Sequence, residues 1–288
     1  MQDLRGVSIV PPAIAYDPVT RVVTITPAAP LDPGQGYRVV ILSPQNDADP
    51  LGLRAIDGAT LDPSTPPIEF TVLQPDAGVD AGASPAPALP TMSFCADVLP
   101  VLTTKCGSSI CHGGTTLPAD GLRLDSPTAV TATALGRVAV GSNRGPRSTA
   151  AAVGSLFGVD MPIVDPGTGT GPAGDPGDSW LLYKLLMAVP PRCVVAAGVG
   201  VDVDAGADAG ASAGKAPTDV SGAHQVLWQP LSPAERDILS SLIPGREMPF
   251  PTNPSARLDQ AKEPLTCDEL ERISLWIAQG AVVPSSCP

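Results

Sequence analysis

Two low-complexity stretches limit where this chain can build a hydrophobic core. PDAGVDAGASPAPALP covers residues 75–90, and a near copy of its centre, DAGADAGAS, covers residues 204–212. Asp, Ala, Gly, Ser and Pro dominate both stretches and offer little apolar surface to bury. We therefore expect a linker at residues 75–91 and a low-complexity insertion at about residues 194–223. The chain is expected to be multi-domain, with one domain at residues 1–74 and a second at residues 92–288.

Composition favours small cores and an oxidising compartment. The chain has 35 Pro and 29 Gly, and aromatic residues make up only 3%, which is typical of chains with long loops. Its net charge of -12 argues against nucleic-acid partners, which need clustered Lys and Arg. It has no run of about 18 apolar residues, so no transmembrane segment is expected. Six cysteines favour a periplasmic, cell-surface or extracellular location.

The first 74 residues have the pattern of an all-β domain. RVVTITP (21–27), YRVVIL (37–42) and IEFTVL (68–73) are rich in β-branched residues, and the turn signal DPVT precedes the first of them. Tyr37 follows a Pro-Gly turn, which is typical of a sandwich strand whose phenol bonds back to the backbone. The region resembles the C-terminal half of a bacterial immunoglobulin-like domain, so a partial β-sandwich is expected. A small free-standing sheet is the alternative.

The N-terminus does not match the expected location. It has no basic segment followed by an apolar run, which would mark an export signal. A sandwich of this class needs about seven strands, and four or five can be counted here. Our hypothesis is that Met1 is not the natural start, and that the missing strands and an export signal lie upstream.

Residues 92–288 are expected to be mostly α-helical, with long loops. Helical patterns occur at residues 93–106, 178–189, 231–245 and 266–281. Pro100 should kink the first helix or delay its start. The expected N-caps are Ser93, Asp178 or Ser179, Ser232 and Thr266, the last two in capping boxes with Glu235 and Glu269.

KCGSSICHGG, residues 105–114, contains the candidate cofactor-binding residues Cys106, Cys111 and His112. Two thiols can add across the two vinyl groups of a porphyrin, and a histidine directly after the second thiol can bind the iron. The usual spacing is C-x-x-C-H, whereas this motif is C-x4-C-H. Covalent haem and a simple disulfide loop both remain open from these residues. Zinc is disfavoured because only one closely spaced cysteine pair exists, and a catalytic Cys–His pair because no orienting third residue is apparent.

The order of motifs from Phe94 to Ala281 resembles the single-haem cytochrome c-like domains of large exported bacterial proteins. DVLPVLTTKC precedes the motif, and GLRLDSP, GDPGDSWLLYKL, EMPFP and LTCDELERISLWIAQGA follow it in order. The resemblance implies one covalent haem c and an electron carrier rather than an enzyme, with an unidentified redox protein as partner. A haem-free, disulfide-stapled surface or binding module of the same fold is the alternative. A haem enzyme is a third possibility, but the chain shows no acid–base pair or nucleophile to support it.

Met248 is the expected sixth ligand of the haem iron, and Met161 is the alternative. Methionine is a common partner of a haem-binding histidine. Both residues precede a proline, which stiffens the loop, and Met248 is followed at the family's distance by the C-terminal helix. His224 is the third candidate and an open site the fourth, whereas Met187 is expected in the core.

The four cysteines outside the motif are disulfide candidates. They can pair in three ways, among which the sequence does not choose. We expect all four to be oxidised in the exported protein. The candidates are Cys95, Cys193, Cys267 and Cys287.

Overall fold

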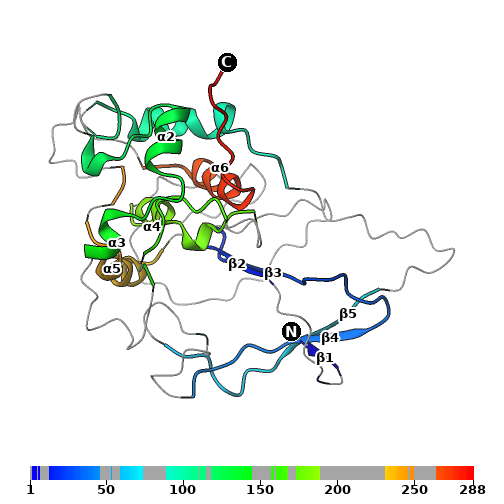
Figure 1. Cartoon of the computed structure of the whole chain (residues 1–288). Coiled ribbons are helices and arrows are strands. Elements are labelled where there is room, and N and C mark those ends of the chain that lie inside the picture. The colour runs from blue at the N-terminus through cyan, green and yellow to red at the C-terminus, as the bar shows by residue number, and fades with distance from the viewer. Residues whose placement is uncertain are drawn as a thin grey trace, which may run out of the picture.

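Strands occupy the N-terminal region of the described chain, and helices occupy the rest (Figure 1). The computed structural model describes residues 2–4, 6, 13–45, 53, 59–73, 89–109, 111–114, 118–144, 157–158, 160–167, 173–188, 231–245, 247–249 and 264–288. Most of the expected linker and all of the expected insertion lie outside these residues. We call the described residues from 89 to 288 the helical unit.

The strands form two small antiparallel sheets. β1 (Gln2–Asp3), β4 (Gly36–Val39) and β5 (Ile68–Thr71) form one sheet in the order β1-β4-β5, and β2 (Ala13–Asp17) pairs with β3 (Val22–Thr26) as a hairpin. Shorter versions of the three strands expected at residues 21–27, 37–42 and 68–73 are therefore present. β1 has only two residues, which are too few to stand out in the sequence.

Tyr37 closes the turn before β4 as its position predicts. Its phenol oxygen accepts a hydrogen bond from the backbone N–H of Asp32 at 2.8 Å. Its ring is buried and lies 5.9 Å from the ring of Phe70, the cross-strand neighbour on β5. The bond from the phenol to the backbone is confirmed, and the immunoglobulin-like assignment stays a prediction.

The first helix of the helical unit runs without a break from Phe94 to Cys106. It consists of η1 (Phe94–Val98), α1 (Leu99–Val101) and η2 (Leu102–Cys106), of which η1 and η2 are π-helical. Ser93 caps it by accepting a hydrogen bond from the N–H of Ala96. Of the two alternatives expected for Pro100, the later start is wrong, because the helix includes this proline between two π-helical turns. A kink at Pro100 stays a prediction.

The remaining helices are α2 (Pro127–Thr133), α3 (Val140–Arg144), α4 (Trp180–Leu186), α5 (Pro233–Leu242) and α6 (Cys267–Ala278), with the 3₁₀ turns η3 (Ala119–Gly121) and η4 (Pro176–Asp178). Both expected capping boxes are present, at the start of α5 and of α6. Ser179 occupies the N-cap position of α4, but its hydroxyl binds Asp165 and Asp175 instead of the helix. None of the described helices has the length and hydropathy needed to span a bilayer.

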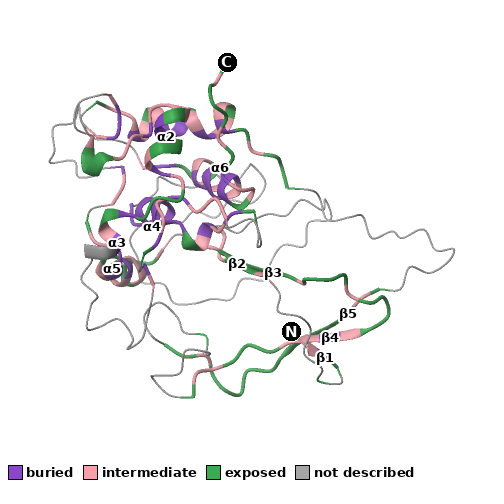
Figure 2. Ribbon diagram, in the orientation of Figure 1, coloured by how far each residue is buried: buried purple, intermediate pink, exposed green. Residues whose placement is uncertain are grey.

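The helical unit has a main core and a second, smaller core. Figure 2 shows that its helices hold most of the buried residues, whereas the strands are mostly intermediate or exposed. The second core confirms that Met187 is a packing residue. The main core includes Val98, Leu102, Cys106, Leu182, Leu270, Ile273 and Trp276, and the second core includes Met161, Trp180, Tyr183, Met187, Leu239 and Ile243.

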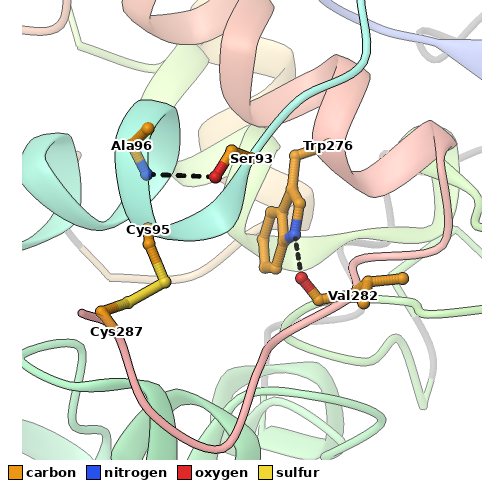
Figure 3. Close-up of a disulfide and its surroundings, with 6 residues drawn as sticks. All are labelled: Ser93, Cys95, Ala96, Trp276, Val282 and Cys287. Atoms are coloured by element: carbon orange, nitrogen blue, oxygen red, sulfur yellow. Dashed lines mark hydrogen bonds between the residues drawn. A yellow bond between two sulfur atoms is a disulfide. The ribbon is translucent and has the colours of Figure 1, made fainter.

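A disulfide between Cys95 and Cys287 joins the first helix to the C-terminal tail (Figure 3). Beside it, the ring nitrogen Nε1 of Trp276 donates to the carbonyl oxygen of Val282 at 3.1 Å. Cys267 is also disulfide-bonded, while Cys193 lies outside the described residues. The four cysteines can form two disulfides in three ways. The Cys95–Cys287 bond is compatible with the way in which Cys193 pairs with Cys267.

The tip of the β2–β3 hairpin enters the main core of the helical unit. Val19, at this tip, is 1% exposed and belongs to the main core. The carboxylate of Asp17 accepts hydrogen bonds from the N–H of Val19 and, at 2.8 Å, from the hydroxyl of Ser274 on α6. Arg21 forms an ion pair of 3.1 Å with Glu235 on α5. The hairpin is therefore bonded to two helices that follow it by more than 200 residues in the sequence.

We expect Val19→Ala to lower the free energy of unfolding of the helical unit by about 2 kcal/mol, because it removes two fully buried methyl groups from the main core. Tryptophan fluorescence during urea denaturation is the measurement, since Trp180, Trp228 and Trp276 all follow the hairpin in the chain. The matched control is Val23→Ala on β3, whose side chain is 56% exposed. Equal midpoints for the two variants would show that the hairpin does not support the helical unit.

Candidate functional site

The loop from Cys106 to Gly114 follows directly on η2. The carbonyl oxygen of Ser108 accepts hydrogen bonds from the N–H groups of Cys111 and Gly113, both at 3.0 Å, and the N–H of His112 donates to the carbonyl of Cys106 at 3.1 Å. A Cβ atom at Gly113 would lie 2.0 Å from the carbonyl oxygen of residue 107, so glycine is required there. These hydrogen bonds bring the backbone of Cys106 to that of His112.

A second segment, part of the GLRLDSP stretch at residues 121–127, fastens this loop. The N–H of Leu124 donates to the carbonyl oxygen of His112 at 2.7 Å. The N–H of Gly114 donates to the carboxylate of Asp125 at 2.7 Å, and Arg123 forms an ion pair with Asp125 at 3.3 Å. The histidine is therefore held from both sides by backbone hydrogen bonds.

The imidazole of His112 is buried and oriented by a backbone carbonyl. It is 7% exposed, and its Nδ1 lies 3.2 Å from the carbonyl oxygen of Leu122. Because a carbonyl can only accept, we assign the proton to Nδ1, which leaves a lone pair on Nε2. Burial lowers the pKa of His112 below its ordinary value, which favours the neutral ring. A neutral imidazole bonded in this way is the form that binds a metal ion through its other nitrogen.

The described cysteines fall into two chemical sets. Cys95, Cys267 and Cys287 are disulfide-bonded. Cys106, which is buried, and Cys111, which is half-buried, are thiols. Among the described cysteines, the thiols are therefore the two cysteines of the motif that contains His112.

The structure places the two candidate methionines in different cores. Met248 packs against the main core, which includes Cys106, and its N–H donates to the carbonyl oxygen of Lys184 at 3.0 Å. Met161 is buried in the second core with Trp180 and Ile243. Met248 therefore packs against the core that contains Cys106, whereas Met161 belongs to the other core. His224 lies outside the described residues.

Lys184 is a residue of this region that sequence reasoning missed. It is 8% exposed on α4, and burial lowers its pKa to about 8, while the charges of Glu247 and Asp120 oppose this shift. Asp120 also acts on the pKa of His112 in the raising direction. The charge of Asp120 thus acts on both His112 and Lys184. The signal in the sequence is a single lysine within the apolar run WLLYKLLMAV.

A group of carboxylates lies elsewhere, around η4. Burial, together with the charges of Asp165 and Asp175, raises the pKa of Asp178 to about 6. Hydrogen bonds from the N–H groups of Gly167 and Gly177 occupy an oxygen of Asp165 and of Asp175, respectively. In the part of the chain that the structure describes, no three His, Cys, Asp or Glu residues are placed to hold a metal ion.

We expect Asp178→Asn to stabilise the protein at neutral pH. The pKa of Asp178 is raised from 3.8 to about 6 in the folded state, so its ionised form is less favourable there than in the unfolded chain. This cost is complete above about pH 6 and disappears as the pH falls toward 4. The melting temperature of Asp178→Asn should exceed that of the wild type at pH 7 and equal it near pH 4. Asp237→Asn, at an exposed position of α5, is the control, and a pH-independent difference would contradict the assignment.

The motif region contains the kinds of donor group that a covalent haem would use. They comprise two thiols, an imidazole whose Nε2 carries the lone pair, and the thioether of Met248 at the core that includes Cys106. The haem itself and the cytochrome c-like assignment stay predictions. Comparison with protein-family models, with curated proteins and with solved structures finds no match to this chain.

Proposed function

We propose that the protein binds one haem c covalently and carries electrons in the cell envelope or outside the cell. The observation that carries this proposal is the imidazole of His112, which is buried, bonded through Nδ1 to the carbonyl of Leu122, and directly follows one of two thiols. A simple disulfide loop would not need a histidine held in a metal-binding tautomer. The disulfide between Cys95 and Cys287 supports an oxidising compartment.

Each residue of the motif has a separate role in this proposal. Cys106 and Cys111 would hold the porphyrin through thioether bonds, and His112 would bind the iron through Nε2. The carbonyl of Leu122 keeps the proton on Nδ1 and makes Nε2 a stronger donor. Met248 is the proposed sixth ligand. A bound haem c supplies a one-electron couple between ferric and ferrous iron.

The main core would set the environment of the haem. Cys106 is part of this core, together with apolar side chains such as Leu102 and Leu124. Such surroundings limit access of water and influence the reduction potential. This environment suits electron transfer. A haem iron bound by two protein ligands and shielded from water has no open position for a substrate.

The test is expression together with a cytochrome c maturation system, followed by an absorption spectrum of the reduced protein and haem staining on a denaturing gel. We expect a red protein whose stain persists, and loss of the stain in the double variant Cys106→Ser/Cys111→Ser. Cys95→Ser/Cys287→Ser also removes two cysteines and should keep the stain. A colourless wild type with a disulfide between Cys106 and Cys111 would overturn the proposal in favour of a haem-free, disulfide-stapled module.

A further inference from the structure

We propose that Lys184 is a positioning residue that fastens the loop carrying Met248, and so holds the methionine at the iron. The inference rests on the proposed function. One residue of α4 binds this segment at two positions: Nζ of Lys184 donates to the carbonyl oxygen of Pro244, and the carbonyl oxygen of Lys184 accepts from the N–H of Met248 at 3.0 Å. The backbone is therefore bonded to α4 four residues before the proposed ligand and at the ligand itself.

The ammonium group of Lys184 is placed for contacts within the protein rather than with water. The side chain is 8% exposed, and Nζ lies 5.9 Å from the ring centroid of Trp180. The charge of Glu247, the residue before Met248, acts on it favourably, as does that of Asp120. A lysine is costly to bury unless its charge is compensated, and here its compensation comes from the two segments that hold the proposed iron ligands.

The loop backbone comes close to this ammonium group. Gly245 has a φ angle of +90°, and a Cβ atom there would lie 3.1 Å from Nζ of Lys184. The backbone at Gly245 therefore lies next to the ammonium group of Lys184. Leu182 and Leu185 anchor α4 in the main core, where both side chains are buried.

A fixed loop matters for a weak ligand. A site holds its ligands well when the supporting residues are locked in place by packing and hydrogen bonds. Loss of a hydrogen bond from a charged donor costs enough free energy to change an equilibrium constant about tenfold. The equilibrium at issue is the competition between Met248 and an external ligand for the iron. An external ligand should therefore displace Met248 more easily once the ammonium group is removed.

The experiment titrates imidazole into the oxidised holoprotein and follows the far-red charge-transfer band, which reports the sulfur–iron bond. We expect Lys184→Met to bind imidazole about tenfold more tightly than the wild type, with covalent haem retained. Lys184→Arg keeps a charged donor and should fall between the two. Lys105→Met is the matched control: it removes the same charge on η2, next to Cys106, where Lys105 lies 4.0 Å from Glu269. It should leave imidazole binding unchanged.

The outcomes separate this inference from the proposed function. A wild type without haem overturns both. A wild type with haem but without the band overturns the role of Met248 and this inference, and leaves covalent haem binding in place. Equal imidazole affinity in the wild type and Lys184→Met, or equal increases in Lys184→Met and Lys105→Met, overturns this inference alone. Should Lys184→Met fail to fold by circular dichroism, Lys184→Arg decides: unchanged imidazole affinity then overturns the inference.

Discussion

Met248→Ala is expected to abolish the far-red sulfur-to-iron charge-transfer band of the oxidised protein and to lower its midpoint potential, while the haem stays attached. The band requires a bond between a methionine sulfur and ferric iron. A thioether ligand favours ferrous iron, so its loss lowers the potential. Covalent attachment depends on Cys106 and Cys111 and should not change. An absorption spectrum, a redox titration and a haem-stained gel are the three measurements.

Met161→Ala is the matched control for this prediction. Met161 is buried in the second core, so its truncation should keep the band and lower the free energy of unfolding by about 2–5 kcal/mol. Loss of the band in Met161→Ala, together with an unchanged band and potential in Met248→Ala, would assign the ligand to Met161 instead.

Replacing Cys95 and Cys287 together by serine is expected to lower the free energy of unfolding by about 3–5 kcal/mol. The two cysteines are 192 positions apart, and a cross-link over so long a loop strongly restricts the unfolded chain. The disulfide also ties the start of the first helix to the tail that carries Val282, the acceptor for Trp276 (Figure 3).

Urea denaturation followed by circular dichroism, under non-reducing conditions, measures this loss. Ser286→Ala is the control in the same tail, because Ser286 is exposed, and it should change the free energy of unfolding by less than about 0.5 kcal/mol. An equally small loss in Cys95→Ser/Cys287→Ser would show that the disulfide does not restrain the unfolded chain.

Local features of the fold could be predicted from the sequence. The capping boxes of α5 and α6 depend on Ser232 with Glu235 and on Thr266 with Glu269, which are three positions apart. The bond from Tyr37 to Asp32 spans five positions. α2 was missed although Ser126 caps it and Pro127 is its first residue, because its seven residues include few large apolar side chains and show no clear helical period.

At the candidate site, the sequence identifies the chemical groups but not their arrangement. Cys106, Cys111 and His112 stand out as a motif because they are neighbours in the chain. Their extra spacing left the geometry open, and only the structure shows that the N–H of His112 donates to the carbonyl oxygen of Cys106. Lys184 could not be connected with Met248, because the residues that separate them give no pattern that brings the two together.

The sequence by itself therefore determined the capping boxes of α5 and α6, the turn at Tyr37 and the reactive groups of the motif, since these depend on residues a few positions apart. Only the tertiary structure decided that Cys95 pairs with Cys287, that Val19 enters the main core, and that Met248 and Met161 lie in different cores. The physical reason is that such contacts join distant parts of the chain. Their partners are selected by how the whole core packs, and this packing leaves no short-range pattern in the sequence.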